Sequence, residues 1–65
     1  MKYEVRLVGA NFERKDKTIL ETENRTEAFE KMRYVRQHRH EEPFNYYDSV
    51  YVLENSDWIA RFKLY

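Results

Sequence analysis

One stretch of helical periodicity, flanked on each side by alternating segments, most constrains how this 65-residue chain can fold. Within residues 26–39, Ala28, Phe29 and Val35 lie within about 60° of Met32 on a helical wheel. The segments before and after this stretch follow the two-residue period of strands. The order predicted is β-β-α-β-β, an α+β fold in which a four-stranded antiparallel or mixed sheet packs one helix on one face.

The first third of the chain predicts a hairpin. Its opening run, KYEVRLV at residues 2–8, alternates apolar and charged side chains, as is typical of a strand buried on one face. Gly9 interrupts the pattern, and the polar run ERKDK at 13–17 suits a turn. We therefore expect residues 2–12 and 17–23 to pair with each other.

The helix is predicted to cover about residues 26–39, with Asn24 or Thr26 as its N-cap. Acidic side chains lie near its start and basic ones near its end, as the helix dipole favours. Pro43 disfavours helical backbone at the residue before it, so the helix should end by about residue 41.

The last third predicts a second hairpin, with strands at 48–54 and 58–65 joined by the turn residues NSD at 55–57. Alternation along the second strand gives an expected core face of Trp58, Ala60, Phe62 and Leu64. The opposite face would hold Ile59, Arg61, Lys63 and Tyr65. Because a single helix covers only one side of a sheet, this second face must meet solvent or a partner.

Length and composition indicate one small soluble domain over residues 1–65, which we expect in the cytoplasm. The chain has no cysteine, which excludes disulfides and thiolate metal sites, and its formal net charge of +0 removes the bulk electrostatic argument for nucleic acid or an anionic membrane. No apolar stretch approaches the roughly 18 residues of a membrane span. The strand pair, the TEAFEKM helix and the final hairpin together resemble short proteins encoded by bacteria and phages, and no residue role follows from that resemblance.

Neither a metal nor a cofactor is expected. His38 and His40 would share an ion only on a strand, since on a helix their side chains point about 200° apart. The chain holds no other histidine and no cysteine, whereas zinc sites usually need three or four ligands. Enzymatic function is not expected either, because neither serine lies in a nucleophile-elbow pattern and a single glycine cannot build a phosphate-binding loop.

An aromatic content of 17% is large for one small core, and it favours a protein-interaction module. Such a module would bind a protein partner, or a second copy of itself, through the uncovered sheet face and the Tyr-rich segment 44–51. The candidate contact residues are Phe44, Tyr46, Tyr47, Ile59 and Tyr65.

Binding of nucleic acid is the alternative, through the basic second half of the helix. Its candidate residues are Arg33, Tyr34, Arg36 and Arg39. Arg36 and Arg39 fall within about 40° of Met32, on the core side of the wheel. Either the helix extends past the sheet there, or the arginine stems cover an apolar edge while their guanidinium groups reach solvent, or the guanidinium groups face something anionic. The acids at 41, 42 and 48 are close enough in sequence to neutralise much of this charge.

Overall fold

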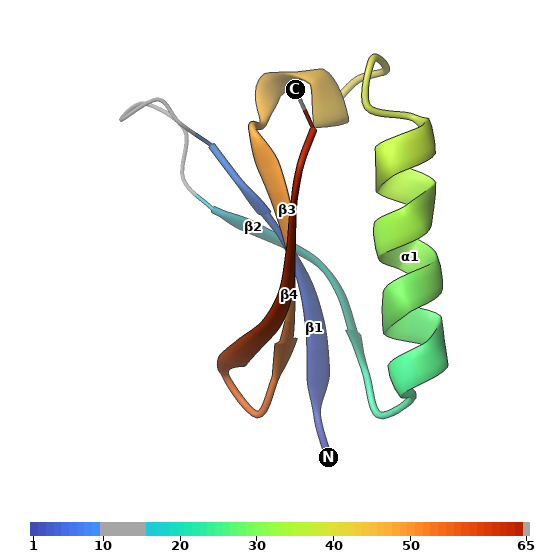
Figure 1. The fold of residues 1–65 in the computed structure, drawn as a ribbon, viewed down its shortest axis with the longest axis vertical. Helices are drawn as coiled ribbons and strands as arrows, with labels where there is room; N and C mark the ends of the chain where they lie inside the picture. The colour runs from blue at the N-terminus through green and yellow to red at the C-terminus, as the bar shows by residue number, and fades with distance from the viewer. Residues whose placement is uncertain (10–15, 65) are drawn as a thin grey trace.

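The computed structural model describes residues 1–9 and 16–64. Its elements are β1 (Tyr3–Val8), β2 (Lys17–Thr22), α1 (Arg25–Gln37), the 3-10 turn η1 (Phe44–Tyr46), β3 (Ser49–Glu54) and β4 (Asp57–Lys63). The strands form one antiparallel sheet in the order β2-β1-β3-β4, and α1 packs on one of its faces (Figure 1). The predicted fold class is confirmed, and the strand order, which the sequence left open, places β1 and β3 in the centre.

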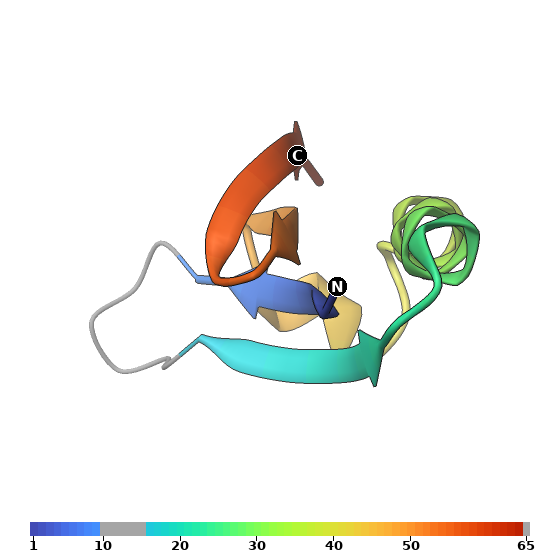
Figure 2. The same ribbon diagram turned by 90° about the horizontal axis from the view of Figure 1, so that it is seen from below.

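The hydrophobic core lies between α1 and the two central strands. Alternate residues of β1 and β3 point toward the helix, and the apolar face of the helix packs against them. The buried cluster consists of Tyr3, Val5, Leu7, Ala28, Met32, Val35, Val50, Val52 and Leu64. Seen from below, the sheet is strongly twisted, and α1 lies on one side of it (Figure 2).

Both ends of α1 are closed by hydrogen bonds that satisfy the orphan backbone groups of a helix. Asn24 is the N-cap, and its side-chain oxygen accepts a hydrogen bond from the backbone N–H of Glu27 at 3.2 Å. At the other end the backbone N–H of His38 donates to the carbonyls of Tyr34 and Val35. The helix therefore ends at Gln37, two residues before the end of the predicted range and well before Pro43.

A β-bulge in the β3–β4 pair decides which face Trp58 occupies. Val52 is opposite Ala60 but Leu53 is opposite Trp58, so Ile59 is an extra residue in β4. The extra residue reverses the alternation, and Trp58 lies on the face away from α1 with 59% of its surface exposed. The expectation that Trp58 belongs to the core is thus wrong, whereas Ala60 and Phe62 pack against the core as predicted.

The turn between β3 and β4 has two residues, Asn55 and Ser56, both with positive φ (51° and 76°). This left-handed geometry matches the twist of a tight hairpin and is favourable for asparagine and glycine. Asn55 also ties down the start of β1, because its backbone N–H donates to the Lys2 carbonyl at 2.8 Å and its side chain accepts from the Lys2 N–H at 3.1 Å. At Ser56 the positive φ is less favourable, since it brings the Cβ atom too close to a backbone carbonyl oxygen.

Replacing Ser56 with glycine should therefore stabilise the domain. We expect Ser56→Gly to raise the free energy of unfolding by about 0.5–1 kcal/mol, measured by urea denaturation, because glycine adopts positive φ without a steric cost. Ser56→Ala is the matched control and should give no gain, since it keeps the Cβ. An equal gain from both variants would show that backbone strain at Ser56 is not the cause.

Candidate interaction surface

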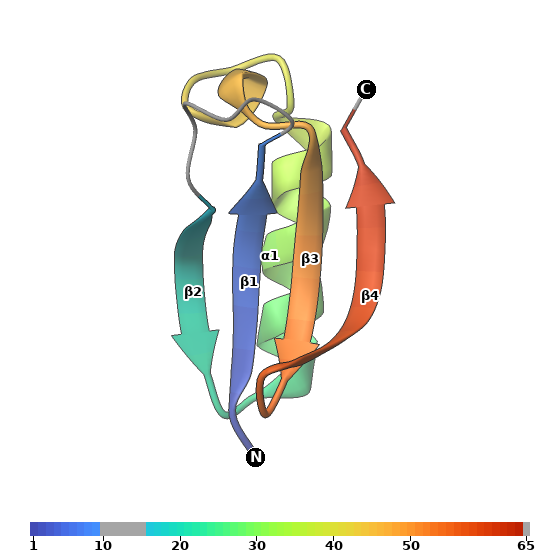
Figure 3. The same cartoon turned by 90° about the vertical axis from the view of Figure 1, so that its left-hand side faces the viewer.

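The sheet face that points away from α1, called the open face below, carries no described helix or strand (Figure 3). The register places its residues in rows that run across the four strands. The first row contains Glu21, Glu4, Leu53 and Trp58. The second contains Thr18, Arg6, Tyr51 and Arg61, and a third, shorter row contains Val8, Ser49 and Lys63.

An aromatic cluster occupies the β3–β4 side of the open face. Tyr51 and Trp58 meet edge to face, with ring centroids 6.2 Å apart and an interplanar angle of 67°. The guanidinium carbon of Arg61 lies 5.7 Å from the centroid of the Trp58 ring, in a cation–π contact. Leu53, only 6% exposed, lies in the same row as Trp58 and is not part of the cluster beneath α1. Tyr51, Leu53, Trp58 and Arg61 are called the Trp58 cluster.

The acids of the open face are paired within the face. Glu4 accepts from Arg6 at 2.8 Å, and Glu21 lies 3.6 Å from the Lys2 ammonium. Neither Arg61 nor Lys63 forms an ion pair with any residue that the structure describes. The β4 side of the open face therefore carries an excess of positive charge.

The basic end of α1 reaches inward at Arg36. Its guanidinium carbon lies 4.4 Å from the centroid of the Phe62 ring, on the helix side of β4. Arg39 folds back and donates from Nη1 to the Arg36 carbonyl at 2.9 Å. Arg36 therefore reaches inward, but it is the guanidinium and not only the stem that lies against the apolar edge of the sheet.

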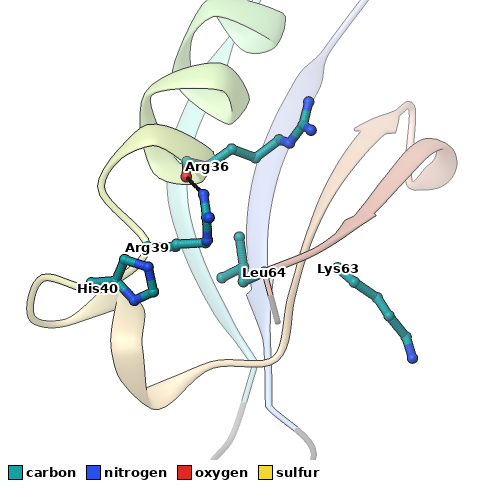
Figure 4. A pocket seen from close by; sticks show the side chains of 5 residues that line it. All are labelled: Arg36, Arg39, His40, Lys63 and Leu64. Atoms are coloured by element: carbon teal, nitrogen blue, oxygen red, sulfur yellow. Dashed lines mark hydrogen bonds between the residues drawn. The ribbon is translucent and has the colours of Figure 1, made fainter.

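A basic hollow of about 450 Å³ lies between this end of α1 and the end of β4 (Figure 4). It is lined by Arg36, Arg39, His40, Lys63 and Leu64. Leu64 is 3% exposed and supplies the apolar part of the lining, whereas the Lys63 side chain points away from the arginines. Within the part of the chain that the structure describes, no acid lines the hollow.

Tyr34, the aromatic residue of the predicted nucleic-acid site, is engaged by its own neighbours. Its ring stacks on His38 with centroids 4.0 Å apart, and the Lys31 ammonium lies 5.1 Å from its centroid. Phe44 approaches it edge-on at 6.0 Å. Arg33 is exposed on α1. The structure thus leaves Tyr34 poorly placed to stack a base, although its side chain remains 46% exposed.

The Tyr-rich segment 44–51 does not form one surface. Phe44 and Tyr47 are partly buried and pack against the core. Tyr46 is 42% exposed, and its hydroxyl donates to Glu42 at 2.6 Å. Of the aromatic residues in this segment, only Tyr51, from β3, lies on the open face.

Of the remaining protein-binding candidates, Ile59 is exposed in the bulge of β4. Tyr65 lies outside the described residues.

The residue that the sequence reading placed on the wrong side is Trp58. One signal in the sequence points to a second apolar face: in SVYVLE, the sequence of β3, apolar side chains stand at consecutive positions instead of alternating with polar ones. Val50 and Val52 belong to the core, so Tyr51 and Leu53 lie on the other face. There they can be buried only by apolar side chains from a neighbouring strand. Trp58 is such a side chain.

Comparison with known proteins finds no matching family model, no matching curated protein and no matching solved structure. Within residues 1–9 and 16–64, no helix is long and apolar enough to cross a membrane. The same residues contain no group of three or more His, Asp or Glu side chains that is placed to hold a metal ion.

The contact between Arg36 and Phe62 predicts a measurable loss of stability. Arg36→Ala should lower the free energy of unfolding by about 1 kcal/mol, because it removes the cation–π contact of the guanidinium with the Phe62 ring. Thermal and urea unfolding measure the change. Arg33→Ala, on the same helix but without such a contact, should change stability by less than about 0.5 kcal/mol, and equal effects would contradict this role for Arg36.

Trp58 is the only tryptophan, so its fluorescence reports directly on the placement that the bulge dictates. We expect the folded protein to emit close to the wavelength of the unfolded protein, since 59% of the Trp58 surface is exposed. Iodide should quench it more effectively than caesium, because Arg61 and Lys63 attract anions. Arg61→Gln should reduce this preference. A strongly blue-shifted emission that neither ion quenches would place Trp58 in the core instead.

Proposed function

We propose that this protein is a small non-enzymatic interaction module that binds a protein partner through its open face. The observation that carries the proposal is the exposure of Trp58, 59% of whose surface remains accessible in a chain that has no other tryptophan. Tryptophan, tyrosine and arginine are the residue types that contribute most at protein interfaces, and the Trp58 cluster contains all three. Leu53 adds an apolar base to the cluster.

The energetic cost of this arrangement supports the proposal. A 65-residue domain has little stability to spare, and burial of a large aromatic side chain would add roughly 2–3 kcal/mol. The bulge at Ile59 instead turns Trp58 to the side that no described helix or strand covers. Bulges commonly re-aim a side chain at a functional position. The ring is therefore available for contact with another molecule.

A different protein suits the open face better than a second copy of this chain. Four strands about 4.8 Å apart and six residues of about 3.3 Å each give a face of roughly 400 Å². Two copies would bury roughly 800 Å² in total, below the roughly 1,200 Å² of a stable interface. A two-fold axis through the Trp58 cluster would also bring Arg61 close to its own copy. A larger partner can extend beyond the rim of the sheet, so it can bury more area and need not bring a second Arg61 close to the first.

The nucleic-acid alternative keeps one supporting observation. Arg61 and Lys63 lie on the β4 side of the open face, and the basic hollow continues the positive charge past the end of that strand. The contacts of Tyr34 with His38 and Lys31 count against the stacking role first expected for it. The experiment below distinguishes the two classes of partner.

The test titrates ¹⁵N-labelled protein with unlabelled lysate of its native host and follows each backbone amide by NMR. Binding of a large protein should selectively broaden the amides of β3 and β4 around Tyr51 and Trp58. Treatment of the lysate with protease should abolish the effect, and treatment with nuclease should leave it intact. Trp58→Ala should remove it too, whereas Tyr34→Ala, which removes an exposed ring from the helix, should not.

Two outcomes would overturn the proposal. Broadening that disappears with nuclease and survives protease would show that the partner is a nucleic acid. Broadening that is absent, or that is confined to residues of α1, would show that the open face is not the binding surface.

A further inference from the structure

We infer that the partner presents an acidic, extended segment that lies along the second half of β4 and places an apolar side chain against Trp58. This inference rests on the proposed function and names the chemistry of its partner. It follows from how charge is distributed around β4, the edge strand of the sheet next to β3.

Cationic side chains flank the second half of β4 on both sides. Arg61 and Lys63 belong to the open face. On the helix side, Arg36 lies over Phe62, and Arg39 lines the hollow beside Leu64. An anionic chain that follows this edge would meet positive charge on either side of it (Figure 4).

The acids near this end of the molecule are engaged in local contacts within their own segment. Glu41 lies 3.7 Å from His38, and Glu42 accepts a hydrogen bond from the Tyr46 hydroxyl. Asp48 is adjacent to β4, since its backbone carbonyl accepts from the Leu64 N–H at 2.8 Å, and its one carboxylate is outnumbered by the cations around the strand. Among the described residues none of these acids forms an ion pair with Arg61 or Lys63, so the positive charge on the open-face side of β4 persists.

Three of the arginines are held in place before any partner arrives. Arg36 lies against Phe62, Arg61 lies against Trp58, and Arg39 is hydrogen-bonded to a backbone carbonyl. A preordered guanidinium loses less conformational entropy on binding, and its planar geometry suits the two oxygens of a carboxylate. The arrangement therefore favours carboxylates presented by a partner.

An acidic protein segment fits this surface better than a single nucleic-acid strand. Binding of single strands relies on successive aromatic rings that stack successive bases. Among the described residues of the open face, Trp58 is the one largely exposed ring, and Tyr51 contacts it from the side. Ile59, which is exposed in the bulge next to Trp58, adds aliphatic surface, which suits an apolar side chain.

The experiment uses synthetic probes and the fluorescence of Trp58. The first peptide has about ten residues, enough to span the strand, and consists of glutamate and aspartate with two central leucines. The second replaces each acid with its amide, and the third probe is a thymidine oligonucleotide of similar length. We expect the acidic peptide alone to change the Trp58 emission, and its affinity to fall about tenfold between low salt and physiological salt.

Matched variants test the role of the cations without removing the reporter. Arg61→Gln and Lys63→Gln should each weaken binding of the acidic peptide several-fold. Lys17→Gln removes the same charge from β2, the opposite edge strand, and should leave the affinity unchanged. An equal loss of affinity in all three variants would show that the peptide responds only to the net charge of the protein, and it would overturn the inference.

The results also separate this inference from the proposed function. Equal binding of the acidic and amide peptides, or binding of the oligonucleotide alone, overturns the acidic segment. Binding of neither peptide overturns it as well. If the protease-sensitive broadening of the open face by lysate persists in these cases, the open face still binds a protein, but one of different chemistry.

Discussion

One helix must cover a four-stranded sheet, and this constraint governs the rest of the structure. A helix of 13 residues is about 20 Å long and about 10 Å wide, roughly half the width of the sheet. It packs mainly on β1, β2 and β3. The face behind the sheet receives no described helix at all, and β4 lies at the margin of the covered face. Apolar side chains on the open face and on β4 must therefore be covered by something other than α1, or remain exposed.

The aromatic side chains on the two faces of β4 differ in how far they are covered. On the helix side, Arg36 extends from α1 and lies over Phe62. A charged side chain thus covers a ring that a second helix would cover in a larger domain. On the open face Arg61 makes a similar but longer contact with Trp58, at 5.7 Å, and 59% of the Trp58 surface remains exposed. The greater exposure of Trp58 than of Phe62 supports the proposal that the open face contacts another molecule.

The sequence predicts the elements of this fold well, because hydrophobic periodicity determines them. Alternation in KYEVRLV and the helical spacing of Ala28, Met32 and Val35 identify the sides that meet in the core. The order of the strands is less accessible, since it depends on long-range pairing that no local pattern encodes. The helical wheel places Arg36 on the core side but leaves its contact open, and the structure shows its guanidinium over Phe62.

The candidate surface was harder to predict, and the reason is the single extra residue at Ile59. A strict two-residue period assigns Trp58 to the core, whereas one bulge moves every residue before it to the opposite face. Propensity does not reveal the bulge, since isoleucine is a strong strand former. The interaction of Tyr51 and Leu53 with Trp58 across the pair gives the bulge its physical reason.

Local rules are usually broken where a protein does something besides fold. In this chain the strict alternation of β4 is broken at Ile59, and the consequence is an exposed tryptophan next to cations that have no acidic partner among the described residues. Stability alone does not account for both features, because a buried Trp58 and a paired Arg61 would each stabilise the folded state more. The proposed binding of an acidic protein segment would account for both features, because the ring would gain apolar contact and the cations would gain carboxylates.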